Sequence, residues 1–131
     1  MDEFETEMAQ LVEDGIKSNP LRLTYEAEVR ALSSMPDQLR AEGYSEEQIA
    51  HEMHNRRREL GRQFKQAAPP LFREYIYAAT AAKYGDPLGP TFEMLREKKT
   101  HAQIIESASR PIDDLDNRLS LDGFIKWYRS L

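Results

Sequence analysis

Residues 83–111 read K-Y-G-D-P-L-G-P-T-F-E-M-L-R-E-K-K-T-H-A-Q-I-I-E-S-A-S-R-P, and this stretch decides the fold. It predicts a helix that ends at Lys83-Tyr84, a left-handed cap at Gly85 and a turn at Asp86-Pro87. The next helix begins at Gly89-Pro90-Thr91. Because each of the two prolines fixes a backbone φ angle, we expect a stiff corner that holds its side chains in place.

Helices are predicted on both sides of this corner. Apolar residues recur with a helical period over residues 1–18, 20–34, 45–67, 70–84 and 120–131, and Pro36 separates the second helix from a short piece that ends at Gly43. Two capping boxes, S-E-E-Q at 45–48 and T-H-A-Q at 100–103, mark helix starts. No stretch alternates as a β-strand does. We therefore expect an all-α, single-domain bundle of about six to seven helices, built from αα-hairpins.

The chain is expected to form one domain over residues 1–131, with an acidic N-terminal helix at 1–18, a core at 19–111 and a C-terminal turn and helix at 112–131. Hydrophobic residues make up 40% and charged residues 31%, a balance that favours a folded chain over a disordered one. The net charge of −5 resides in residues 1–19, which hold six acidic residues and one lysine. Since the remainder is neutral overall, the charge does not exclude a nucleic-acid partner.

Several kinds of site have no support in the sequence. With no cysteine, the chain has no disulfide, thiolate zinc site or cysteine nucleophile. His51 and His54 lack the H-E-x-x-H spacing, and the acidic residues Asp113, Asp114, Asp116 and Asp122 lack the register of a calcium loop, so we expect no metal and no other cofactor. No apolar run reaches the ~20 residues of a membrane-spanning helix, and the acidic start lacks the features of a signal peptide. We expect a cytoplasmic protein.

The helix over residues 45–67 carries a cationic stripe. Its apolar face holds Ile49, Met53, Leu60 and Phe64, and the opposite face holds His51, His54, Arg58, Arg62 and Lys65. Such a stripe could follow a phosphate backbone, which makes Arg58, Arg62 and Lys65 candidate nucleic-acid contacts. The alternative is a solvated helix face, supported by pairs one turn apart.

Arg56 falls among the apolar positions of the same helix, between Met53 and Leu60. A guanidinium there snorkels to solvent, forms an ion pair or faces a cleft. In the last case Arg56 joins the candidate nucleic-acid contacts.

A second cluster is expected where the last part of the 83–111 stretch returns to its corner. In an antiparallel arrangement Ser107, Ser109 and Arg110 come near Asp86 and Lys83. These residues either form a reactive group of acid, cations and hydroxyls, or serve as caps, turns and an Asp–Arg ion pair.

The runs N-P-L-R-L-T-Y-E-A-E-V-R-A-L, L-R-A-E-G-Y-S-E-E-Q-I-A and R-R-E-L-G precede two more specific ones, Y-G-D-P-L-G-P-T and S-A-S-R-P. In these runs the chain resembles the C-terminal modules of bacterial polymorphic toxins, the variable tips of Rhs-type, filamentous-haemagglutinin-type and contact-dependent inhibition proteins. The resemblance spans about residues 19 to 111.

This resemblance implies a small toxic module used in competition between bacteria, often a nuclease, which travels with a cognate immunity protein. It also implies delivery into a target bacterial cytoplasm as part of a larger carrier. With RNA as the target, the catalytic candidates that it suggests are Lys83, Tyr84, Asp86, Thr91, Ser107, Ser109 and Arg110. Asp86 would serve as a base or hydrogen-bond acceptor, and Arg110 and Lys83 would bind phosphate.

The chain departs from the toxin pattern at both ends. Relatives of this type end in a Gly-rich tail, whereas this chain continues with an acidic turn and a helix that contains Trp127. It also begins with its own Met and an acidic helix. Two alternatives therefore stay open: an orphaned derivative of a toxin module, and a non-catalytic helical interaction module, such as an immunity or adaptor protein, whose acidic first helix docks on a basic partner.

Overall fold

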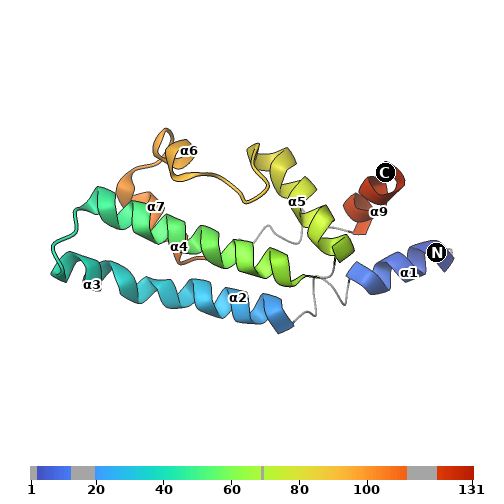
Figure 1. Cartoon of the computed structure of the whole chain (residues 1–131), viewed down its shortest axis with the longest axis horizontal. Coiled ribbons are helices and arrows are strands. Elements are labelled where there is room, and N and C mark those ends of the chain that lie inside the picture. Colours follow the sequence, from blue (N-terminus) through green and yellow to red (C-terminus); the bar gives the residue numbers. More distant parts are fainter. Residues whose placement is uncertain (1–2, 13–19, 69, 112–120) are drawn as a thin grey trace.

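The computed structural model describes residues 3–12, 20–68, 70–111 and 121–131. The described residues form helices and connecting turns and contain no β-strand (Figure 1). The elements are α1 (Glu3–Val12), α2 (Pro20–Ala31), the 3-10 helix η2 (Leu32–Ser34), α3 (Met35–Ala41), α4 (Glu46–Ala67), α5 (Pro70–Tyr84), α6 (Phe92–Arg96), α7 (His101–Ala108) and α9 (Leu121–Arg129). The predicted all-α, single-domain bundle is confirmed.

Helices α2, η2 and α3 run nearly in one line, and α4 returns alongside them in the opposite direction (Figure 1). Pro36 stands in the first turn of α3, where its missing N–H costs nothing. Gly43 makes the turn with φ of 91°, in the left-handed region that favours glycine. The predicted capping box then starts α4, because Ser45 and Gln48 bond reciprocally to each other's backbone N–H.

Helix α4 is the central element and contacts α2, α3, α5, α6 and α7. The apolar cluster between α4 and α7 includes Ile49, Met53 and Ile104, none of which has exposed surface. A second cluster joins the C-terminal part of α4 to α5 and α9 through Phe64, Tyr75, Ile76 and Phe124. Because neighbouring elements cover α4 on several sides, some of its polar side chains lie between α4 and these neighbours. The candidate site is built from these side chains.

The corner between α5 and α6 contains the predicted left-handed cap at Gly85. Gly85 and Gly89 both have positive φ, 78° and 95°, which side chains with a Cβ rarely adopt. Thr91 caps α6 by accepting from the N–H of Met94. The corner therefore turns sharply and brings α6 against α4.

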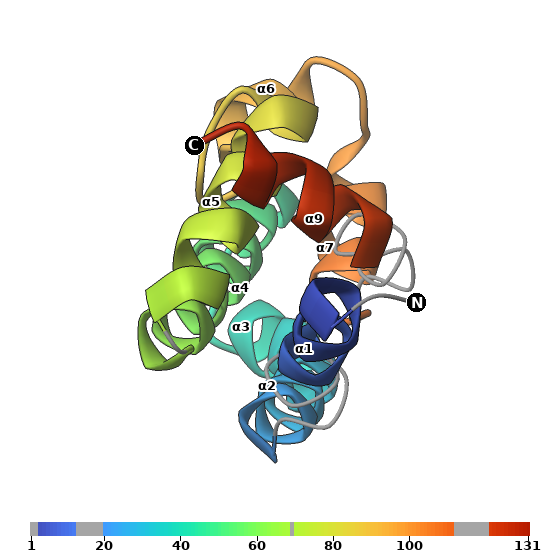
Figure 2. The ribbon, with the colours of Figure 1, turned by 90° about the vertical axis from the view of Figure 1, so that its right-hand side faces the viewer.

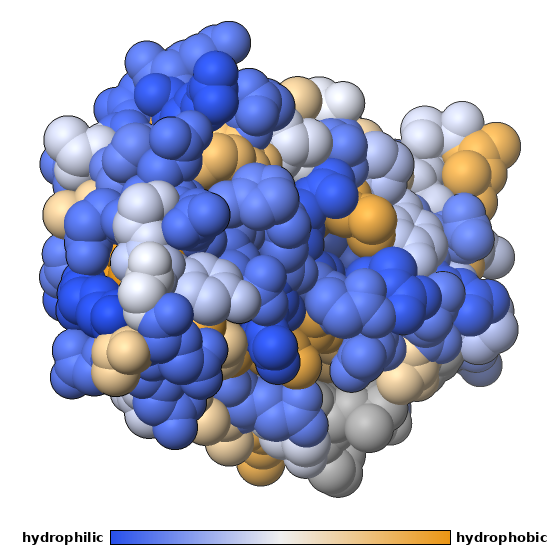
Figure 3. Space-filling view, turned by 60° about the vertical axis from the view of Figure 1, so that its left-hand side comes forward, coloured by the Kyte–Doolittle hydropathy of each residue, from blue (hydrophilic) through white to orange (hydrophobic). Residues whose placement is uncertain are grey.

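Helices α1 and α9 pack together at one end of the molecule, where both termini lie (Figures 1 and 2). One face of the molecule is largely hydrophilic, and apolar residues appear there only in small separate patches (Figure 3). None of the helices in the described ranges is long and apolar enough to cross a membrane.

The α4–α7 cluster is expected to supply a large share of the stability. Replacing the fully buried Met53 with alanine removes packed atoms and leaves a cavity, so we expect Met53→Ala to lower the free energy of unfolding by about 2–5 kcal/mol. Urea denaturation measures this change. The matched control is Asn55→Ala at an exposed position of the same helix, and an equal loss in both variants would contradict the assignment of the core.

Candidate functional site

An ion pair holds the corner against α4. Arg58 Nη2 donates to Asp86 Oδ1 at 2.9 Å, and the two side chains are only 27% and 28% exposed. The same carboxylate oxygen accepts from the backbone N–H of Leu88 at 2.8 Å. Because the pair is partly shielded from solvent, salt screens it less than it screens a fully exposed ion pair. Asp86 thus acts as the link between α4 and the corner.

Two further side chains of α4 donate to carbonyl groups of the corner. His54 Nε2 donates to the Pro90 carbonyl at 2.7 Å, and Lys65 Nζ donates to the Pro87 carbonyl at 3.2 Å. Both side chains are buried, so an unmade hydrogen bond at either would be costly. We call His54, Arg58 and Lys65 the α4 clamp.

The α4 clamp corrects the expectation of an exposed cationic stripe. That expectation is wrong for His54 and Lys65, which are buried under the corner, and Arg58 is only partly accessible. Arg62 remains nearer the surface, where its donors bond to Glu59 and Gln66. The periodicity of α4 identifies its most apolar face, but it carries no information about which later segment covers the polar one.

Arg56 adopts one of the three environments expected for it. Its side chain is 57% exposed rather than placed among the apolar residues, and its Nε donates to Glu52 Oε1 at 3.1 Å. Of the three alternatives, the ion pair is the one that the structure contains. The arginine that turns inward is its neighbour, Arg57.

Arg57 connects α4 to α2 and to the end of α7. Its Nε donates to the Tyr25 hydroxyl at 3.1 Å, and its Nη1 donates to the carbonyls of Ala108 and Arg110 at 3.2 and 2.6 Å. These carbonyls lie at the C-terminal end of α7, where helix carbonyls lack partners and a cation is favourable. All three partners are uncharged oxygens, and within the described part of the chain Arg57 has no carboxylate partner and Nη2 has no hydrogen bond. Arg57 is therefore a half-buried positive charge, and its Nη2 can donate a further hydrogen bond.

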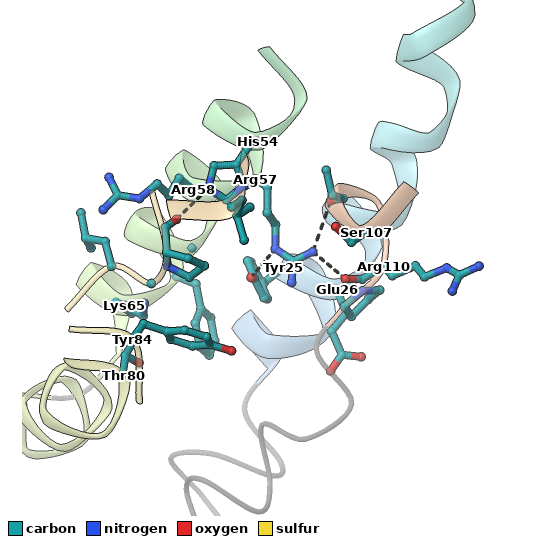
Figure 4. A pocket seen from close by; sticks show the side chains of 18 of the residues that line it. Tyr25, Glu26, His54, Arg57, Arg58, Lys65, Thr80, Tyr84, Ser107 and Arg110 are labelled. Carbon is teal, nitrogen blue, oxygen red and sulfur yellow. Dashed lines mark hydrogen bonds between the residues drawn. The ribbon is translucent and has the colours of Figure 1, made fainter. Parts of the chain in front are cut away.

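A cavity of about 300 Å³ lies beside Arg57. Side chains from α2, α4, α5 and α7 and the corner surround it (Figure 4). Its apolar wall includes Phe64, Ile76, Leu88 and Pro90. Its polar wall includes Glu26, Arg57, Tyr84 and Ser107. Among the described lining residues, Glu26 has the only carboxylate, so the cavity is cationic within an acidic chain.

Gly61 forms part of the cavity wall in the interior of α4. Glycine inside a helix costs about 1 kcal/mol relative to alanine. The backbone here does not require it, since Gly61 is not among the glycines with positive φ. Nor does packing, because a Cβ at this position would meet only the Tyr25 hydroxyl, at an ordinary contact distance of 3.8 Å.

The structure gives Asp86 and Arg110 different partners instead of pairing them. Asp86 bonds to Arg58, as described, and Arg110 forms an ion pair with Glu106 one turn earlier in α7. The Arg110 side chain is 72% exposed and extends away from the cavity, although its backbone contributes to the wall (Figure 4).

The remaining catalytic candidates lie at helix ends. The hydroxyls of Ser107 and Ser109 donate to the carbonyls of Ile104 and Glu106, and Thr91 serves as the cap of α6. Lys83 is exposed, with its ammonium over the ring of Tyr84 at 5.4 Å. Of this set, Tyr84 and Ser107 line the cavity through their side chains (Figure 4).

Burial lowers the pKa of His54, and the nearby charges of Arg58 and Arg57 lower it further, while the bond to the Pro90 carbonyl opposes them. The neutral ring is therefore favoured in the folded state. A neutral ring whose Nε2 donates to a carbonyl carries its proton on that nitrogen.

Sequence reasoning did not identify Tyr25, Glu26, Arg57 or Gly61 as parts of a site. Arg57 stands in the run Arg56-Arg57-Arg58, where composition alone does not distinguish the three. The signal that the sequence offered was Gly61. A glycine inside a helix lowers the stability of that helix, so its presence points to a role in packing or binding.

No family model, curated protein or solved structure matches the chain. No relative therefore transfers a role to these residues. Among the described residues no group of three or more His, Asp or Glu side chains is arranged to hold a metal ion, and Asp113, Asp114 and Asp116 lie outside the described ranges.

A double-mutant cycle tests the link between α4 and the corner. Arg58→Ala and Asp86→Ala should each lower the free energy of unfolding, with a coupling energy of about 1–2 kcal/mol between them, because their shielded groups contact each other directly. The exposed pair Arg110 and Glu106 serves as control, with an expected coupling below about 0.5 kcal/mol. Equal coupling in the two pairs would mean that the corner is not held by Asp86.

The lowered pKa of His54 predicts a dependence of stability on pH. Below about pH 6.5, where an unfolded histidine binds a proton, the unfolded state takes up more protons at this residue than the folded state does. Stability should therefore fall as the pH decreases through this region and be regained as it rises. Between pH 5 and 8, the midpoint of thermal unfolding should depend less on pH in His54→Gln than in His101→Gln. The same dependence in both variants would rule out His54 as its source.

Proposed function

We propose that the chain is a toxin-type module that acts on RNA, and that a phosphate group of the RNA binds at Arg57. The observation that carries this proposal is the half-buried guanidinium of Arg57, which is held by three neutral oxygens and borders a cavity. An anion in the cavity would neutralise this charge and accept from its remaining donor.

The chemistry of the cavity favours phosphate as that anion. A guanidinium offers planar, paired donors that match the oxygens of a phosphate group, and the fixed position of Arg57 lowers the entropy lost on binding. Apolar side chains line the rest of the cavity. A ligand with an anionic group next to a flat aromatic ring fits this combination, and RNA consists of such units.

Glu26 supplies the group that cleavage requires. It lines the cavity, and its side chain is 21% exposed. In the proposed reaction the 2′-hydroxyl oxygen of the RNA attacks the adjacent phosphorus and the bond from phosphorus to O5′ breaks. The carboxylate of Glu26 accepts the 2′-hydroxyl proton, and the departing O5′ takes a proton from water. Arg57 stabilises the charge that grows on the phosphate oxygens.

A non-catalytic interaction module is the second candidate function. The observation that favours it is the exposed acidic surface of α1, where Glu3 and Glu7 are accessible. A basic partner would complement this surface, and a cognate immunity protein or an adaptor target is a partner of this kind.

Expression of the chain inside bacteria distinguishes the two functions. We expect growth arrest with fragmented RNA, and Glu26→Gln should reduce RNA cleavage by about 10²–10⁴-fold because it removes the proton acceptor. The matched control is Glu28→Gln, at an exposed position on the same helix that does not line the cavity.

Growing cells with intact RNA, despite the presence of folded protein, would refute the RNA-directed function and favour the interaction module. Undiminished cleavage by Glu26→Gln would refute the role of Glu26 alone.

A further inference from the structure

We infer that the cavity beside Arg57 binds a single nucleotide, with its base among the apolar side chains and its 3′-phosphate on the guanidinium. The inference rests on the proposed function and names the unit of RNA that the site recognises. It is carried by the glycine that keeps the cavity open, the character of the walls and the unused donor of Arg57.

Gly61 is the first observation. It weakens α4 relative to alanine, yet neither a left-handed backbone nor a close neighbour requires it. What the missing side chain provides is space beside Tyr25, on the cavity wall. A ligand that occupies this space would account for the glycine.

The walls indicate which part of the ligand enters. The ring of Tyr25 stacks on Phe64 with centroids 5.0 Å apart, and both residues line the cavity together with Ile76 and Leu88. Arg57 lies over the Tyr25 ring at 5.7 Å, so a base would meet the remaining apolar surface of the wall, and contacts of this kind depend little on base identity. The volume of about 300 Å³ lies at the lower end of the range for small-molecule sites, so it suits one nucleotide rather than a longer stretch.

The polar edge indicates where the phosphate lies. Arg57 Nη2 makes no hydrogen bond to the described residues, while the other donors of the guanidinium fix its plane (Figure 4). Lys99 also lines the cavity and is exposed, so it adds positive charge at the rim. A phosphate attached to a base held in the cavity can meet both side chains.

Calorimetric titration of the whole chain with uridine 3′-monophosphate tests the inference. We expect binding at least tenfold tighter than that of uridine or of inorganic phosphate, since only the nucleotide uses both parts of the site. Equal binding of inorganic phosphate would overturn the base site, and equal binding of uridine would overturn the role of Arg57. Absence of binding at millimolar nucleotide would overturn the inference as a whole.

Variants of Gly61 test the location. Gly61→Leu fills the cavity and should weaken binding of uridine 3′-monophosphate at least tenfold, whereas Gln63→Leu, at an exposed position outside the cavity, should leave it unchanged. Gly61→Ala should raise the thermal midpoint by about 4 °C, because alanine favours the helix. A lowered midpoint would show that packing requires the glycine and would remove the argument for an open cavity.

Lys99 provides a test that does not alter the interior. Lys99→Ala should weaken nucleotide binding about threefold at low salt, and Lys98→Ala, which does not line the cavity, should have no effect. Equal effects of the two variants would place the phosphate elsewhere.

The binding and activity measurements separate this inference from the proposed function. RNA cleavage that persists in Gly61→Leu would overturn the inference alone. Tight nucleotide binding by a chain that neither arrests growth nor cleaves RNA would overturn the proposed function alone.

Discussion

The rest of the structure depends on hydrogen bonds that polar side chains of α4 donate to oxygen atoms of later segments. The α4 clamp holds the corner through Asp86 and the carbonyls of Pro87 and Pro90. Arg57 holds the end of α7 through the carbonyl of its last residue, Ala108, and through the carbonyl of Arg110 two residues later. His54 and Lys65 thereby gain partners for buried donors, and Arg57 gives a partner to the Ala108 carbonyl. These contacts position both segments on the central helix and thereby shape the cavity between them.

Most of the fold was predictable because its signals are local. The capping boxes at Ser45 and Thr100 begin α4 and α7 as predicted, and the left-handed cap at Gly85 follows α5. Proline and glycine act through their own backbone angles and capping boxes through neighbours three residues apart, so neither requires knowledge of the tertiary structure.

The candidate site was less predictable because its contacts are distant in sequence. Arg57 bonds to carbonyls 51 and 53 residues later. Because every residue has a backbone carbonyl, the residue types do not show which carbonyl accepts a bond. The three consecutive arginines show the consequence, since each meets a different environment: Arg56 pairs within α4, Arg57 faces α2 and α7, and Arg58 faces the corner. Successive residues of a helix point about 100° apart. A prediction that is wrong by one position therefore selects Arg56, which forms a surface ion pair, in place of Arg57, which borders the cavity.

Arg57 is the proposed anion receptor, and the NMR signals of arginine side chains test this proposal most directly. During titration with uridine 3′-monophosphate, the guanidinium signals of Arg57, assigned with an Arg57→Lys variant, should shift progressively to saturation, because Nη2 gains a phosphate oxygen as its partner. The exposed guanidinium of Arg110 should respond weakly. Saturable shifts at Arg110 or Arg62 with none at Arg57 would contradict the account.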